Sequence, residues 1–191
     1  MLGTKKTLRA QVSESRSQTP TSSWAAEDER RTQMLRTALT GLDPSATVAA
    51  YCSITGEPST HAIIDFLHSQ HRRVLLPVLG HEIAWGWFTG WQHMEVAWRG
   101  IRQPVGRRLG PDALREADII LTPCLAVGLD GTRLGTGGGW YDRALAHRRP
   151  GVPVIALARD AEVFPTVPTE PHDLPIDAVA TPSGLSWLRA I

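Results

Sequence analysis

The segment Asp118-Ile-Ile-Leu-Thr-Pro-Cys-Leu-Ala-Val127 is the most apolar stretch of the sequence, and a glycine-rich segment, residues 128–139, follows it directly. A continuous apolar run bounded in this way predicts a strand buried in a sheet. From about Trp140 to His147 the sequence then favours a helix. A buried strand followed by a loop and a helix indicates an α/β fold.

The same alternation of strands and helices extends in both directions from this segment. Upstream, strands predicted at Thr47–Ile54 and Val74–Leu79 flank a helix at His61–Ser69, which indicates a parallel pair joined by a right-handed crossover. Other elements are expected at residues 4–16 and 23–39 (amphipathic helices), within Glu82–Trp98 (edge or hairpin strands), and at Val152–Ala158 and Asp177–Ala180 (strands). We therefore predict an α/β fold with a layered, largely parallel sheet flanked by helices, in one domain spanning residues 1–191.

Composition and charge narrow the functional classes. Twenty Lys+Arg against nineteen Asp+Glu give a net charge of +1, which argues against binding nucleic acid or an acidic membrane through bulk charge. The two cysteines, Cys52 and Cys124, lie far apart in apolar runs, as expected for buried free thiols in a reducing compartment. No apolar signal core or membrane-spanning stretch is apparent, so we expect a soluble, cytoplasmic protein.

The strongest chemical motif is Arg133-Leu-Gly-Thr-Gly-Gly-Gly-Trp-Tyr-Asp142, between the most apolar strand and the helix. Its glycines allow backbone N–H groups to surround an anion, which predicts phosphate binding. Trp140 excludes a dinucleotide fingerprint, and the Lys-Ser/Thr ending of a P-loop is missing. Asp142 beside phosphates is interpreted as a Mg²⁺ ligand. The alternative is a tight glycine turn capped by Asp142.

Three weaker signals accompany this motif. Lys5 and Lys6 are the only lysines, and Lys5 with Arg9 one helical turn later presents two cations to one anion. Taken alone, this pattern favours the alternative of a solvated amphipathic helix. Glu57 follows the first sheet strand and could bind a polar heterocycle, while the neighbouring Ser59 or Thr60 could simply cap the next helix. Asp177, at the start of a late strand, is a second candidate metal ligand or a turn residue.

Other polar and aromatic residues remain ambiguous. The tryptophans at strand spacing, Trp85, Trp87 and Trp98, are expected in the core rather than in a binding platform. The loop of residues 99–110 could attract a polyanionic tail, contact nucleic acid or simply be solvated, because it carries four arginines and no acidic residue before Asp112: Arg99, Arg102, Arg107 and Arg108.

Taken in order, the lysine-rich start, Gly56-Glu57, Gly100-Ile-Arg-Gln-Pro104, the glycine-rich motif and His172-Asp173 with Asp177 resemble the 5-formyltetrahydrofolate cyclo-ligase family, also called 5,10-methenyltetrahydrofolate synthetases. The resemblance implies an α/β fold similar to the NagB/RpiA/CoA-transferase group. It also implies an ATP-dependent cyclo-ligase that uses Mg·ATP to close 5-formyltetrahydrofolate to 5,10-methenyltetrahydrofolate, with release of ADP and phosphate. In the implied reaction the formyl oxygen attacks the γ-phosphorus, N10 adds to the activated carbon, and phosphate leaves.

The resemblance also implies roles for individual residues. It assigns ATP binding to Lys5, Lys6, Arg9, Arg133, Leu134, Gly135, Thr136, Gly137, Gly138, Gly139, Trp140 and Tyr141. Catalytic roles fall on Lys5, Arg133 and Tyr141, and Mg²⁺ binding on Asp142 and Asp177. The folate, with or without a polyglutamate tail, is expected to contact Cys52, Glu57 and Thr136.

The sequence departs from the family pattern at Ser59, Gln103, Thr136 and Trp140, and none of these departures removes a presumed phosphate or metal ligand. Two alternatives therefore stay open: a diverged paralogue acting on another substrate, and a non-enzymatic module of the same fold that senses a phosphate or nucleotide. We expect the protein to be a monomer or weak homodimer that binds neither nucleic acid nor membrane.

Overall fold

The computed structural model describes residues 3–80 and 82–188. Its helices are α1 (Lys5–Ser17), α2 (Thr21–Thr40), α3 (His61–Ser69) and α4 (Trp140–Leu145), with 3-10 turns at Trp91–His93, Trp98–Gly100, Pro111–Glu116 and Asp160–Glu162. Its strands are β1 (Thr47–Ala49), β2 (Arg73–Val78), β3 (Ala84–Trp87), β4 (Met94–Val96), β5 (Arg102–Pro104), β6 (Ile119–Pro123), β7 (Ala126–Gly128), β8 (Arg133–Leu134), β9 (Val154–Leu157), β10 (Val163–Phe164), β11 (Ala178–Thr181) and β12 (Gly184–Trp187).

The main sheet has the strand order β12-β11-β9-β6-β1-β2-β3. Its five inner strands are parallel, and the edge strands β3 and β12 are antiparallel to their neighbours. The predicted pair is present, with Val48 opposite Val74 and helix α3 in the crossover. The layered, largely parallel α/β fold is therefore confirmed.

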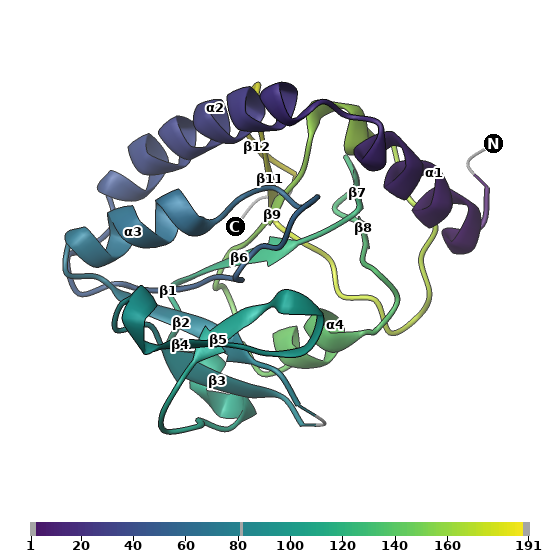
Figure 1. Cartoon of the computed structure of the whole chain (residues 1–191). Helices are drawn as coiled ribbons and strands as arrows, with labels where there is room; N and C mark the ends of the chain where they lie inside the picture. The colour runs from purple at the N-terminus through teal and green to yellow at the C-terminus, as the bar shows by residue number, and fades with distance from the viewer. Residues whose placement is uncertain (1–2, 81, 189–191) are drawn as a thin grey trace.

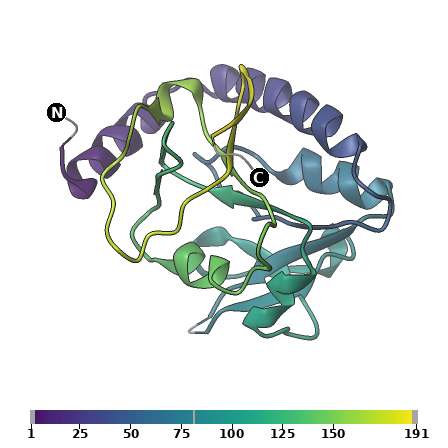
Figure 2. The same ribbon diagram turned by 180° about the vertical axis from the view of Figure 1, so that it is seen from behind.

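Helices cover both faces of this sheet (Figure 1). Successive residues of a strand point to opposite faces, so Leu76 joins the core that α2 and α3 cover, whereas Leu75 joins the core beneath α4. Seen from behind, α4 lies on the face opposite the long α2 helix (Figure 2). No described helix has the combination of length and apolarity that a membrane crossing requires.

The predicted strand at residues 118–127 is interrupted. Strand β6 ends at Pro123, which has no N–H to donate, and the carbonyl of Cys124 instead accepts a hydrogen bond from Arg16 Nη2 over 2.8 Å. The chain then enters a second sheet of order β10-β7-β8. This change of sheet occurs at the carboxyl end of β6, where it opens space for a ligand.

Helix α1 packs on this second sheet. Leu8 and Val12 belong to a small core with Leu125, Ala126 and Leu134. Ala126 lies in β7, Leu134 lies in β8, and Leu125 directly precedes β7. The predicted helix at residues 4–16 is thus confirmed, and its packing places Lys5 and Arg9 beside the glycine-rich loop that follows β8.

Two expectations from the sequence are wrong. Residues 102–104 were expected in a loop but form β5, which pairs with β4 in a hairpin. Trp85 is buried in the core as expected, but Trp98 is 71% exposed because it lies at the tip of that hairpin, beyond the sheet.

Candidate active site

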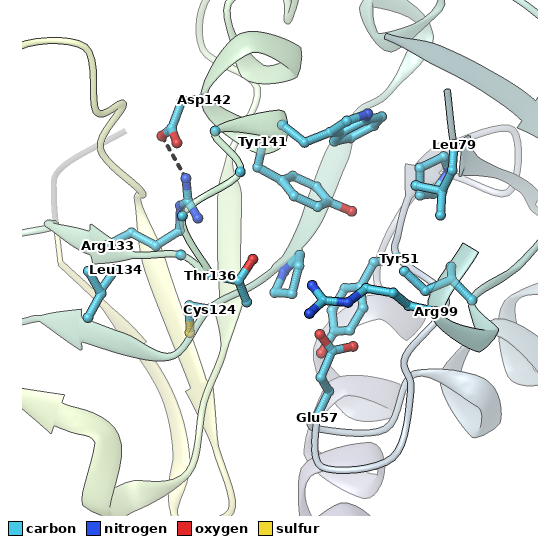
Figure 3. Close-up of a pocket in the computed structure, with 18 of the residues that line it drawn as sticks. Tyr51, Glu57, Leu79, Arg99, Cys124, Arg133, Leu134, Thr136, Tyr141 and Asp142 are labelled. Atoms are coloured by element: carbon cyan, nitrogen blue, oxygen red, sulfur yellow. Dashed lines mark hydrogen bonds and ion pairs between the residues drawn. The ribbon is translucent and has the colours of Figure 1, made fainter. Parts of the chain in front are cut away.

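A cleft of about 650 Å³ opens where the carboxyl ends of β1, β2 and β6 meet α1 and the glycine-rich loop. Its walls come from seven parts of the chain: α1, residues 51–57, residues 77–80, the hairpin tip at 97–101, residues 123–124, residues 133–142 and residues 170–173. Figure 3 shows Arg133 and Asp142 on one side of this space and Leu79 and Arg99 on the other. Segments distant in sequence therefore meet at the position that α/β sheets commonly use for ligands.

The glycine-rich loop lies along one wall of the cleft. Gly137 and Gly139 have φ angles of +104° and +63°, a region that favours glycine. Gly138 has no heavy atom within 4 Å of the place where a Cβ would lie, so its surface is open. Arg9 Nε donates to the carbonyl of Gly135 over 2.8 Å, which fixes the loop against α1.

Arg133 and Asp142 are bound to each other at the ends of this loop. Arg133 Nη2 donates to Asp142 Oδ1 over 2.6 Å, and the backbone N–H of Leu174 donates to the same oxygen over 3.3 Å. Arg133 is buried, and its Nε has no hydrogen-bond partner in the described part of the chain. A buried donor without a partner is costly, so this atom is suited to an anionic ligand.

Lys5 crosses the cleft mouth to two carboxylates. Its Nζ lies 2.5 Å from Asp173 Oδ2 and 2.7 Å from Glu170 Oε2. Burial disfavours the charged ammonium, but the hydrogen bonds to Asp173 and Glu170 outweigh it and raise the pKa of Lys5. Lys5 is therefore a cation under all physiological conditions.

The opposite part of the cleft is mostly apolar and contains one carboxylate. Burial raises the pKa of Glu57, whose Oε2 accepts a hydrogen bond from the Ile54 N–H over 3.1 Å. Cys52 is buried beside it, and burial likewise raises the pKa of its thiol. The Tyr141 hydroxyl is buried with no hydrogen-bond partner among residues 3–80 and 82–188, and burial raises its pKa well above the ordinary value. This region suits a ligand that combines ring surface with polar edges.

Sequence reasoning missed Arg16, a residue of α1 that lines the cleft. It is buried, donates through Nε and Nη2 to both oxygens of Glu162 over 2.6 and 2.7 Å, and donates through Nη1 to the Gly56 carbonyl over 3.2 Å. Arg16 thus ties α1 to the loop that carries Glu57. Spacings of four and seven residues put Lys5, Arg9 and Arg16 on one helix face, and this periodicity could have identified it.

Two predicted site residues lie outside the cleft. Lys6 is exposed and does not line it. Asp177 accepts a hydrogen bond from the Val154 N–H over 2.9 Å and borders a separate hollow with Leu145 and Leu174. The cleft does bring together the other predicted residues: Lys5, Arg9, Cys52, Glu57, Arg133, Leu134, Gly135, Thr136, Gly137, Gly138, Gly139, Trp140, Tyr141 and Asp142.

The fold and this cleft define an α/β protein with a glycine-rich loop opposite a mostly apolar wall. The 5-formyltetrahydrofolate cyclo-ligase family matches residues 2–182, and the chain belongs to this family of ATP-dependent enzymes. It is 38% identical to the 5-formyltetrahydrofolate cyclo-ligase of Mycolicibacterium smegmatis over 194 aligned residues, with 97% of each chain covered. It is 32% identical to the Escherichia coli K12 enzyme of the same name, covering 72% of this chain and 78% of that one.

Solved structures agree with this assignment. The NMR structure of Aquifex aeolicus 5,10-methenyltetrahydrofolate synthetase superimposes with a TM-score of 0.80 at 28% identity, covering 98% of this chain and 94% of that one. The 5,10-methenyltetrahydrofolate synthetase of Mycoplasma pneumoniae has the same fold, with a TM-score of 0.74 at 24% identity and coverage of 93% and 98%.

Proposed function

We propose that this protein uses Mg·ATP to cyclise 5-formyltetrahydrofolate to 5,10-methenyltetrahydrofolate, releasing ADP and phosphate. The observation that carries the proposal is the arrangement of one cleft, in which the glycine-rich loop and its cations lie across from Glu57 and an apolar wall. A phosphate donor and a heterocyclic acceptor need such neighbouring sites, because the phosphoryl group passes directly from one ligand to the other.

The glycine-rich loop and the cations around it form the proposed phosphate side. Arg133 offers a buried, unpartnered Nε, and Arg9 keeps its terminal nitrogens available beyond the bond from Nε to Gly135. Lys5 reaches the same side, where an anionic ligand would compete with Asp173 and Glu170 for its ammonium. Catalysis here is mainly positioning and neutralisation of phosphate charge, so no nucleophilic Ser or Cys is required.

Asp142 is suited to hold Mg²⁺ against the phosphates. Its Oδ1 accepts the hydrogen bonds of Arg133 and Leu174, while Oδ2 receives none in the described part of the chain, and Asp142 lines the cleft that would hold the phosphates. Mg²⁺ in nucleotide sites characteristically takes one or two carboxylates, phosphate oxygens and several waters, so a single Asp fits. When bound, the ion supplies charge neutralisation on the phosphates. The sequence-based role of Asp177 finds less support, because Asp177 does not line this cleft.

Glu57, Cys52 and Tyr141 form the proposed folate side. The Glu57 carboxylate accepts hydrogen bonds from the N–H groups of a pterin ring, and this pairing orients the ring toward the loop. In Figure 3 the buried Tyr141 hydroxyl points into the space between the loop and Leu79, where it can donate to an oxygen of the reacting formyl or phosphoryl group. Thr136 belongs to the loop and also lines the space between the two sides.

The competing hypothesis is a module that binds a phosphorylated ligand without turnover. Phosphate release from Mg·ATP, measured with and without 5-formyltetrahydrofolate, separates the two. The enzyme releases phosphate only when the folate is present, in an amount equal to the folate converted. A binding module releases none in either case, and release that ignores the folate would indicate a simple ATPase.

The expected surroundings of the enzyme belong to the same proposal. We infer that it works in a reducing cytoplasm, which agrees with Cys52 and Cys124 both being free and buried. Its partners would be small molecules, with a reduced folate that carries one or several glutamates as the substrate.

A further inference from the structure

The tip of the β4–β5 hairpin has an unusual residue at a constrained position. The Gly100 N–H donates to the Ala97 carbonyl over 3.2 Å, closing a four-residue turn in which Arg99 has φ +60° and ψ +20°. That position of a turn favours Gly or Asn, because a Cβ is disfavoured at positive φ. Strained positions of this kind concentrate at functional sites, so the side chain of Arg99 is the feature to explain.

Arg99 is a free cation on the wall of the cleft. Its guanidinium carbon lies 4.7 Å from the centre of the Trp98 ring, which holds it above the indole. Within residues 3–80 and 82–188 it makes no ion pair and no side-chain hydrogen bond, and it is exposed. By contrast Arg16 and Arg133, which line the same cleft, are each paired with a carboxylate. Arg99 is therefore available to an anionic ligand.

The position of Arg99 indicates which ligand it meets. In Figure 3 it extends into the space from the side opposite Arg133 and Asp142, so it belongs to the wall that faces the proposed phosphate side. Its neighbours on that wall are apolar: Ile54, Leu79 and Ile101. The cleft thus presents the half-buried carboxylate of Glu57, an apolar wall and then an exposed cation.

The order carboxylate, apolar wall and cation along the cleft matches a reduced folate. In that molecule the pterin N–H groups, the aromatic ring and the glutamate carboxylates follow one another in the same order. We propose that Arg99 binds a carboxylate of the glutamate tail of the folate and so acts as a specificity residue. The inference rests on the proposed function for the identity of the ligand. Trp98 is then a positioning residue, because its ring orients the guanidinium.

A pair of folates that differ only in the tail tests this assignment. Isothermal titration measures the Kd of 5-formyltetrahydrofolate and of 5-formyltetrahydropteroate, which lacks the glutamate, for the full-length wild type and for Arg99→Gln. We expect Arg99→Gln to weaken 5-formyltetrahydrofolate about tenfold, as for the loss of one charge-assisted hydrogen bond. The pteroate should bind both proteins equally, and so should Mg·ATP. Arg107→Gln is the matched control, because Arg107 is exposed in the same arginine-rich segment and does not line the cleft.

The other outcomes overturn the assignment in distinguishable ways. An equal loss for both folates would place Arg99 against the ring system, a loss confined to Mg·ATP would place it on the phosphates, and no loss would leave it a solvated arginine. If Arg99→Gln weakens 5-formyltetrahydrofolate alone but the wild type makes no methenyl product, the proposed function fails and the Arg99 assignment stands. If the wild type binds neither folate, both fail.

Discussion

Arg133 and Asp142 are joined by a hydrogen-bonded ion pair of 2.6 Å, so the residue that opens the glycine-rich loop is bound to the residue that follows it. The pair closes the loop into a fixed frame whose cleft-lining residues include four glycines and Thr136. It also means that Asp142 is already partly neutralised before any ligand binds.

Stabilisation by ATP should require Mg²⁺. Without the ion, the Asp142 carboxylate and the phosphates repel each other, so ATP with EDTA should shift the melting temperature far less than Mg·ATP does. A ligand at 100 times its dissociation constant adds about 2.7 kcal/mol of stability. Thermal melts with ATP, Mg·ATP, and Mg²⁺ alone measure this, and the Mg²⁺-alone sample controls for unspecific ion effects. Equal shifts with and without EDTA would remove the metal role of Asp142.

Lys5→Ala should weaken ATP binding more than Lys6→Ala. Lys5 lines the cleft, whereas Lys6 on the next position of α1 is exposed and serves as the matched control. Removing a charged hydrogen bond costs about 1.5–3 kcal/mol. Titration calorimetry with Mg·ATP compares the two variants, and a urea melt of each shows whether the loss of the contacts to Asp173 and Glu170 affects folding. Similar affinities for the two variants would show that Lys5 does not bind ATP.

Gly138→Ala should reduce nucleotide binding without reducing stability. No heavy atom lies within 4 Å of the added Cβ and the φ angle of Gly138 is ordinary, so the free protein accepts the methyl group. The same methyl prevents close approach of a phosphate to the backbone. Gly137→Ala should lower the urea midpoint in addition to weakening nucleotide binding, because the φ angle of Gly137 is +104°. Unchanged ATP affinity of Gly138→Ala would move the phosphate site away from this loop.

The affinity for 5-formyltetrahydrofolate should depend on the ionisation of Glu57. Burial raises the pKa of this carboxyl, so it takes up its proton at a higher pH than an ordinary glutamate. Only the ionised form accepts two pterin N–H bonds, and affinity should therefore fall about tenfold per pH unit once the pH is below that pKa. Glu57→Gln should bind more weakly at neutral pH and lose this dependence. A parallel pH profile for wild type and Glu57→Gln would assign the titration to another group.

Much of the fold could be predicted from the sequence because its signals are local. The βαβ unit around α3 and the helix that contains Lys5 and Arg9 follow from apolar periodicity within the segments themselves. The break after Pro123 could not be predicted in this way. There the Cys124 carbonyl accepts a hydrogen bond from Arg16, which lies more than a hundred residues earlier in the chain. Periodicity contains no information about such long-range hydrogen bonds.

The site shows the same division. The glycine-rich motif was apparent because a run of glycines beside an Asp is uncommon, and those residues do line the cleft. Trp98 was expected in the core because a hairpin tip and an edge strand have similar apolar alternation. The role of Arg99 was left open. Asp177 was expected near Asp142, but the strand it precedes is on the other side of β9 from β6, and its carboxylate caps the start of β9 instead.

The most direct test of the central claim is optical. Purified full-length protein is mixed with Mg·ATP and 5-formyltetrahydrofolate, and the absorbance of 5,10-methenyltetrahydrofolate is followed over time, with ATP, Mg²⁺ or the folate omitted in turn. Our account predicts that the absorbance rises only in the complete mixture and that Arg133→Gln lowers the rate strongly. A complete mixture with no rise, from protein that still binds Mg·ATP, would contradict it.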